Sequence, residues 1–117
     1  MNDVFVDNLR IAIVRQAVDD YVRSAREIMR LQENRQKYVI DLVVADSKMK
    51  KPYNYTYHTA DLEIQRRIKN LKMDMKNIEK FFTGEYFKTL FNIDGGFMVK
   101  KIREKAKRSR NIDCDLL

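Results

Sequence analysis

Apolar side chains recur at alternating intervals of three and four positions along the first part of the chain. This spacing keeps them on one stripe of a helix. Two polar residues, Gln32 and Arg35, interrupt the stripe before apolar residues restore it. A helix predicted over about residues 4–45 therefore either breaks near Asn34 or leaves its partner there. The stripe before the interruption consists of Ile11, Val14, Val18, Tyr21, Ala25 and Ile28.

A second stripe with the same period follows a tyrosine-rich segment, residues 46–59. That segment lacks the periodicity, and Pro52 opposes helix continuation because its ring removes an N–H group and clashes with the preceding turn. We expect a loop there, with Thr59 as the N-cap of a helix over about residues 60–82. Two matching stripes predict an antiparallel hairpin across the loop. The second stripe consists of Ile64, Ile68, Leu71, Met75, Ile78 and Phe82.

Two further helices are predicted after the hairpin, a short one over residues 85–92 and a basic one over residues 97–110. The run NIDGG between them is typical of a turn, because Gly adopts positive φ easily. A length of 117 residues favours one domain, residues 1–117. The predicted fold class is all-α: a long antiparallel helical hairpin plus a short helix and a basic C-terminal helix, forming a small helical bundle.

The last two predicted helices also have the lengths of a helix-turn-helix motif. The basic helix, however, opens with Phe97, Met98 and Val99 instead of the polar residues that contact base edges. This composition favours the packing of a short helix hairpin over insertion into a DNA groove.

Positive charge is the strongest functional signal, with 24 Lys and Arg against 17 Asp and Glu and a formal net charge of +7. Cations along helix faces bind phosphate backbones by releasing counterions. The alternative interpretation is a basic surface that is only solvated. If the hairpin forms, the candidate polyanion contacts are Arg23, Arg26, Arg30, Lys69, Lys72, Lys76, Lys100, Arg103, Lys107 and Arg110.

Aromatic and basic side chains are interleaved in the predicted loop. Tyr53, Tyr55 and Tyr57 follow three lysines, a mixture that holds single-stranded bases by stacking and charge. Tyrosine also anchors protein interfaces, because it buries a large area with few rotatable bonds. A third interpretation is that the rings simply cover the end of the hairpin.

The chain has few of the residues that usually serve in catalysis or metal binding. One histidine, His58, and one cysteine, Cys114, do not make a zinc site, and no serine lies in a nucleophile motif. We therefore predict a protein that is not an enzyme and has no cofactor or metal. No apolar run is long enough to span a membrane, and the first residues lack a signal-peptide pattern, so we expect a cytoplasmic protein.

Two stretches resemble a family of short, mostly uncharacterised proteins of phages and prophages of Firmicutes. They are NLRIAIVRQAVDDY, residues 8–21, and IEKFFTGEYFKTLFNIDGGFMVKKIREK, residues 78–105, together about a third of the chain. Residues 30–77 fit the family less well, and Tyr86 replaces its usual tryptophan. The resemblance implies a phage accessory protein and carries over no catalytic residues. The matching positions are Gln16, Ala17, Val18, Asp20, Tyr21, Phe81, Phe82, Tyr86, Phe87, Asp94 and Gly95.

Three functions are compatible with these patterns. The first hypothesis is a non-enzymatic phage or prophage protein that binds nucleic acid, or a complex containing it, through basic helix faces. The second is a protein-directed inhibitor of host defence, such as an anti-CRISPR acting on a host nucleic-acid-processing protein, or a sponge for a signalling nucleotide. The third is an assembly role in phage replication or packaging. The helical seam also suits a homo-oligomer.

Overall fold

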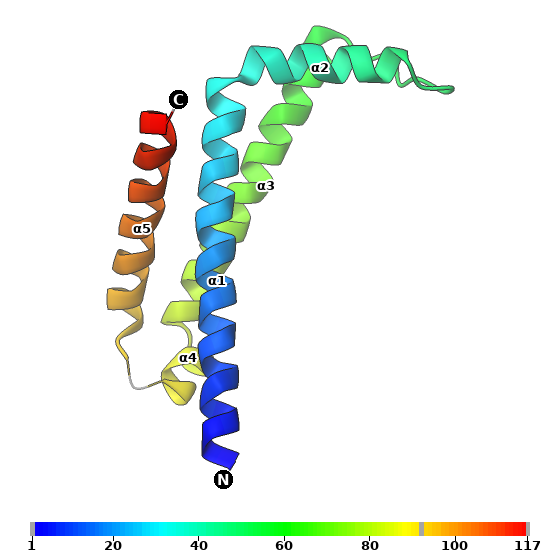
Figure 1. Ribbon diagram of the computed structural model, residues 1–117. Coiled ribbons are helices and arrows are strands. Elements are labelled where there is room, and N and C mark those ends of the chain that lie inside the picture. Colours follow the sequence, from blue (N-terminus) through cyan, green and yellow to red (C-terminus); the bar gives the residue numbers. More distant parts are fainter. Residues whose placement is uncertain (1, 92, 117) are drawn as a thin grey trace.

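The chain folds into helices joined by short connections (Figure 1). The computed structural model describes the backbone of residues 2–91 and 93–116 and the side chains of residues 7–91 and 93–108. Over the described backbone there are five helices and no strand, which confirms the all-α class. The helices are α1 (Asn2–Glu33), α2 (Arg35–Ser47), α3 (Tyr57–Thr83), α4 (Glu85–Leu90) and α5 (Gly95–Leu116).

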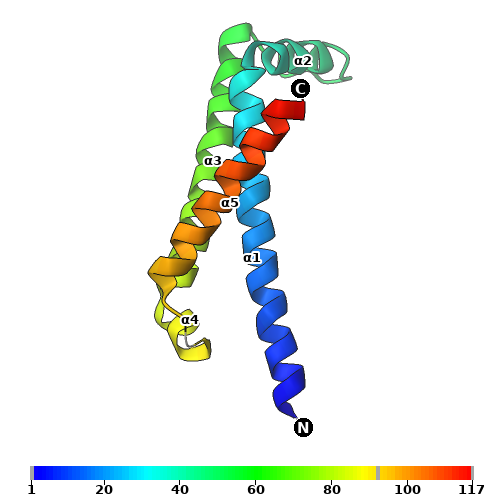
Figure 2. The ribbon, with the colours of Figure 1, turned by 60° about the vertical axis from the view of Figure 1, so that its left-hand side comes forward.

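Three of the helices form the body of the molecule. α3 runs antiparallel to α1, as the matching stripes predict, and α5 turns back to pack against both of them (Figures 1 and 2). α2 projects from the top of this body as an arm, and α3 begins behind it (Figure 1). The molecule is elongated, measuring 58 × 34 × 22 Å.

The helix predicted over residues 4–45 is two helices, because it breaks at Asn34, the first of the two alternatives for this stretch. The side-chain amide of Asn34 donates a hydrogen bond to the carbonyl oxygen of Arg30 at the end of α1. Beyond the break, Arg35 is held by Asp61 on α3, with 2.8 Å between its Nη2 and the carboxylate Oδ2. The chain bends because α2 packs against the start of α3 instead of continuing along α1.

α3 begins three residues earlier than the prediction of residues 60–82. Its N-cap is Thr56, and Thr59 is the third residue of the helix. The Thr59 N–H donates to the Thr56 Oγ1 atom at 3.2 Å, and the Thr56 N–H donates to the Thr59 Oγ1 atom at 2.9 Å. This reciprocal capping box places Tyr57 in the helix, so the loop is shorter than residues 46–59.

The last two helices differ from the prediction in their ends. α4 is shorter than residues 85–92, and α5 extends beyond residues 97–110 on both sides. α5 begins at Gly95, which lies against the end of α3. A Cβ atom on Gly95 would lie 2.0 Å from the carbonyl oxygen of Phe82, so only glycine fits this close approach.

Two groups of buried side chains form the core, one in each half of the molecule. Most of the predicted stripe residues contribute to these groups, but Ile11 is exposed because α1 extends beyond the end of α3 (Figure 1). Where α1, α3, α4 and α5 meet, the buried residues are Tyr21, Val22, Ala25, Phe82, Phe87, Val99, Ile102 and Ala106. Where α1, α2 and α3 meet, they are Ile28, Leu31, Val39, Ala60, Ile64 and Ile68.

Candidate polyanion-binding surface

A polar junction ties the three helices of the body together. The carboxylate of Glu79 on α3 accepts a hydrogen bond from the Tyr21 hydroxyl on α1, with 2.7 Å between the oxygens. The same carboxylate accepts two hydrogen bonds from the Arg103 guanidinium on α5, one of them from Nε at 3.3 Å. Arg103 is therefore already engaged in joining α5 to α3.

The junction changes the acidity of its members. Burial and the hydrogen bond to Glu79 raise the pKa of Tyr21 to about 12. The hydrogen bonds from Arg103 lower the pKa of the Glu79 carboxyl below its usual value, and the charge of Lys76 lowers it further. Tyr21 therefore stays neutral and Glu79 stays ionised over the physiological pH range.

We expect the junction to make the fold sensitive to alkaline pH. Tyr21 ionises near pH 10 in the unfolded chain and at about 12 in the folded protein, so its contribution to stability is lost as pH rises through this window. The midpoint of urea unfolding, measured from pH 9 to 12, should fall more steeply for the wild type than for Tyr21→Phe. Parallel curves for the two proteins would contradict this assignment.

Exposed lysines continue along both helices from this junction. Lys72 and Lys76 precede Glu79 by seven and three residues, so they lie on the same side of α3. Lys100 and Lys107 lie three residues before and four residues after Arg103, on the same side of α5.

We call these four lysines, together with Lys69, the lysine face. All of its members are exposed, and none forms an ion pair with a described residue. The lysine face consists of Lys69, Lys72, Lys76, Lys100 and Lys107.

The arginines predicted on the first helix lie elsewhere. Arg23 and Arg30 are exposed on α1, and Arg23 lies beside Asp74 and Asn77 of α3. Each also pairs with an acid one turn earlier: 3.8 Å separates Arg23 from Asp20, and 3.9 Å separates Arg30 from Glu27. Arg26 is exposed but is not free of partners. The side chain of Arg110 lies outside the described residues.

A buried carboxylate organises the tyrosine-rich loop. Asp46, near the end of α2, is only 4% exposed. Its Oδ1 atom accepts the Tyr53 N–H at 2.7 Å, and its Oδ2 atom accepts the Tyr55 N–H at 2.9 Å. Asn54 between them adopts a φ of 58°, which turns the backbone so that both N–H groups reach the carboxylate.

The three tyrosines are not equivalent. Tyr53 is 75% exposed at the end of the arm, whereas Tyr55 is half-buried against the core shared by α1, α2 and α3. The rings of Tyr53 and Tyr55 lie 5.9 Å apart. Tyr57 is exposed in the first turn of α3. Tyr53 and Tyr57 are available for stacking or for a protein contact, and Tyr55 packs within the fold.

Asp46→Ala should destabilise the protein, because it leaves two backbone N–H groups without their charged acceptor. We expect a loss of about 1–3 kcal/mol in the free energy of unfolding. Urea unfolding measures this loss, and limited proteolysis should cut the loop of the variant faster. Asp19→Ala is the matched control, because Asp19 is exposed on α1 and has no ion pair with a described residue. Equal stability of the two variants would contradict the role of Asp46.

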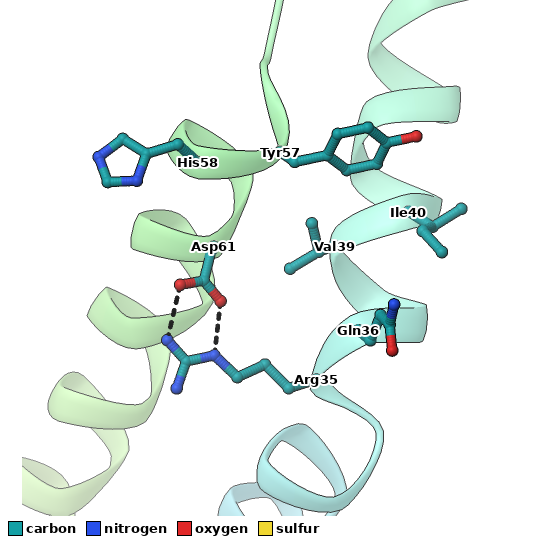
Figure 3. A pocket seen from close by; sticks show the side chains of 7 residues that line it. All are labelled: Arg35, Gln36, Val39, Ile40, Tyr57, His58 and Asp61. Atoms are coloured by element: carbon teal, nitrogen blue, oxygen red, sulfur yellow. Dashed lines mark hydrogen bonds and ion pairs between the residues drawn. The ribbon is translucent and has the colours of Figure 1, made fainter.

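A groove separates α2 from the start of α3 (Figure 3). It has a volume of about 650 Å³, with the ion pair of Arg35 and Asp61 at one end. His58 lies at the edge of the groove, with its ring turned away from α2 (Figure 3). The sequence pattern did not reveal this groove, because it depends on the bend at Asn34. It is lined by Arg35, Gln36, Val39, Ile40, Tyr57, His58 and Asp61.

Within the described part of the chain, no three His, Cys, Asp or Glu side chains are grouped so as to hold a metal ion. None of the described helices is long and apolar enough to cross a membrane.

Comparison with protein-family models, curated proteins and solved structures gives no match. The resemblance to phage and prophage proteins stays a prediction.

Proposed function

We propose that this chain is a non-enzymatic protein that binds a polyanion, namely a nucleic acid, through the lysine face. The observation that carries the proposal is a set of five exposed lysines on α3 and α5 without ion pairs to described residues. Arg103, between Lys100 and Lys107 on α5, pairs with Glu79, which follows the lysines of α3, and this pair holds the two helices together. Because two stretches of its sequence resemble phage and prophage proteins, we propose that the protein acts in phage or prophage biology.

The physical basis is electrostatic. Exposed lysine ammonium groups that form no ion pair attract phosphates at little cost, because no existing ion pair has to be broken. Contacts of this kind read no base sequence. The formal net charge of +7 also steers anionic partners toward the protein.

Fluorescence anisotropy tests the proposal with labelled single-stranded RNA, single-stranded DNA and duplex DNA. For five phosphate contacts on duplex DNA, we expect affinity to fall about 10²–10³-fold between ~50 and ~200 mM salt. Unrelated base sequences of the same nucleic acid should bind equally well. Failure to bind any of the three at low salt would contradict the proposal and favour an inhibitor of a host protein.

A further inference from the structure

The loop at the end of the arm carries positive charge without a balancing acid (Figure 1). We call residues 48–55 the arm tip. Lys48, Lys50 and Lys51 are all exposed, and none forms an ion pair with a described residue. Residues 47–60 include no Asp or Glu, and the preceding acid, Asp46, is buried and already accepts two backbone N–H groups of the loop. The charge of the arm tip is therefore available to an anionic partner.

The ring of Tyr53 follows these lysines and is held in place although it is 75% exposed. Pro52 before it has a φ angle fixed by its own ring, and Asn54 after it adopts a φ of 58°. The Tyr53 N–H donates to the Asp46 carboxylate at 2.7 Å, and the ring lies beside that of Tyr55, with 30° between the two planes. A side chain that is positioned without being buried loses little freedom when it binds a partner.

We propose that the arm tip is a second nucleic-acid contact, specific for single strands, in which a base stacks on the ring of Tyr53 and the neighbouring phosphates lie against Lys50 and Lys51. In a duplex, adjacent base pairs cover the faces of each base, so only a single strand offers a base to the ring. Every base has such a face, and the contact therefore tolerates any sequence. A protein partner is less well matched, because lysine is depleted at protein interfaces.

Anisotropy titrations at low salt separate the ring from the charge when the ligands are an oligothymidine strand, an abasic strand of the same length and a duplex. Tyr53→Ala should weaken binding of the oligothymidine about tenfold or more, and should change binding of the other two less than about twofold. Tyr53→Phe keeps the ring and should bind like the wild type. Tyr86→Ala is the matched control, because Tyr86 is also exposed and lies on α4, far from the arm (Figure 1).

The lysines of the arm tip have a signature of their own. On a single strand each lost phosphate contact removes ~0.7 from the salt slope, so the double variant Lys50→Ala and Lys51→Ala should lower the slope by about 1.4. Lys48 stays unchanged in this variant, because it forms the C-cap of α2 and its charge also stabilises the end of that helix. An unchanged slope would contradict the phosphate contacts.

The outcomes distinguish this contact from the lysine face. Equal losses on all three ligands for Tyr53→Ala, or no loss on the oligothymidine, would overturn the arm-tip proposal, and so would a wild type that binds the abasic strand as tightly as the oligothymidine. Because Tyr53 is exposed, its variants should unfold at the wild-type midpoint, which circular dichroism checks. Duplex binding that survives charge reversal on the lysine face would contradict that face and leave the arm tip standing. No binding of any ligand would overturn both proposals and favour an acidic protein as the partner.

Discussion

Replacing Phe82 with alanine should lower the free energy of unfolding by about 3–5 kcal/mol, as is typical for a fully buried phenylalanine. Phe82 is 1% exposed, and its ring packs edge-on against Phe81 and Phe87, with 5.2 Å between ring centres in each pair. It belongs to the core where α1, α3, α4 and α5 meet. The cavity would therefore weaken several helix contacts at once. Urea unfolding followed by circular dichroism measures the loss.

Phe97→Ala is the matched control for this substitution. Phe97 is exposed on α5, where its ring lies beneath the ammonium group of Lys101, 5.3 Å from ring centre to Nζ. Its removal should cost about 1 kcal/mol or less. Similar losses for the two variants would mean that the aromatic cluster is not the main point of contact between the helices.

Reversing three charges of the lysine face should have the largest effect on binding. In the triple variant Lys72→Glu, Lys76→Glu and Lys107→Glu, three phosphate contacts become repulsive. Each lost contact removes ~0.9 from the salt slope on duplex DNA, so affinity near 0.1 M salt should fall by about 10²–10³-fold or more. The loss should be the same for unrelated base sequences. Anisotropy titrations at several salt concentrations give both the affinity and the slope.

A triple reversal on α1 has the same effect on net charge and serves as its control. Arg15→Glu, Arg23→Glu and Arg30→Glu change exposed residues on a helix that the lysine face does not include. We expect less than about a tenfold loss from this variant, because only long-range attraction is reduced. Equal losses from the two triple variants would contradict the lysine face and would restore the wider surface predicted from the sequence, which includes the arginines of α1.

The helices themselves could be predicted because the spacing of apolar residues is a local property of the sequence. The stripes ending at Ile28 and Phe82 fall on α1 and α3, and both residues are buried. The break at Asn34 was anticipated only as an alternative. Its cause is a long-range contact: α2 packs against the start of α3, where Arg35 pairs with Asp61. The start of α3 was misplaced because Thr59 takes the place of the usual Glu or Gln in the capping box.

The candidate site shows the same division between local and long-range information. Helical spacing correctly predicted that Lys72, Lys76 and Lys107 are exposed. It did not reveal that Arg103 is engaged with Glu79, because that pairing depends on how α5 crosses α3. The role of Asp46 was also missed, since a carboxylate at the end of a helix gives no sign that a later loop will fold back onto it.

Nuclear magnetic resonance of the isotope-labelled protein locates the binding surface most directly. The nucleic acid that binds best in the anisotropy assay is added in steps at low salt, and the shift of each backbone amide is recorded. We predict that the largest changes fall on residues 69–76 of α3 and 100–107 of α5. Shifts confined to α2 and the tyrosine-rich loop, or no shifts at all, would contradict binding through the lysine face.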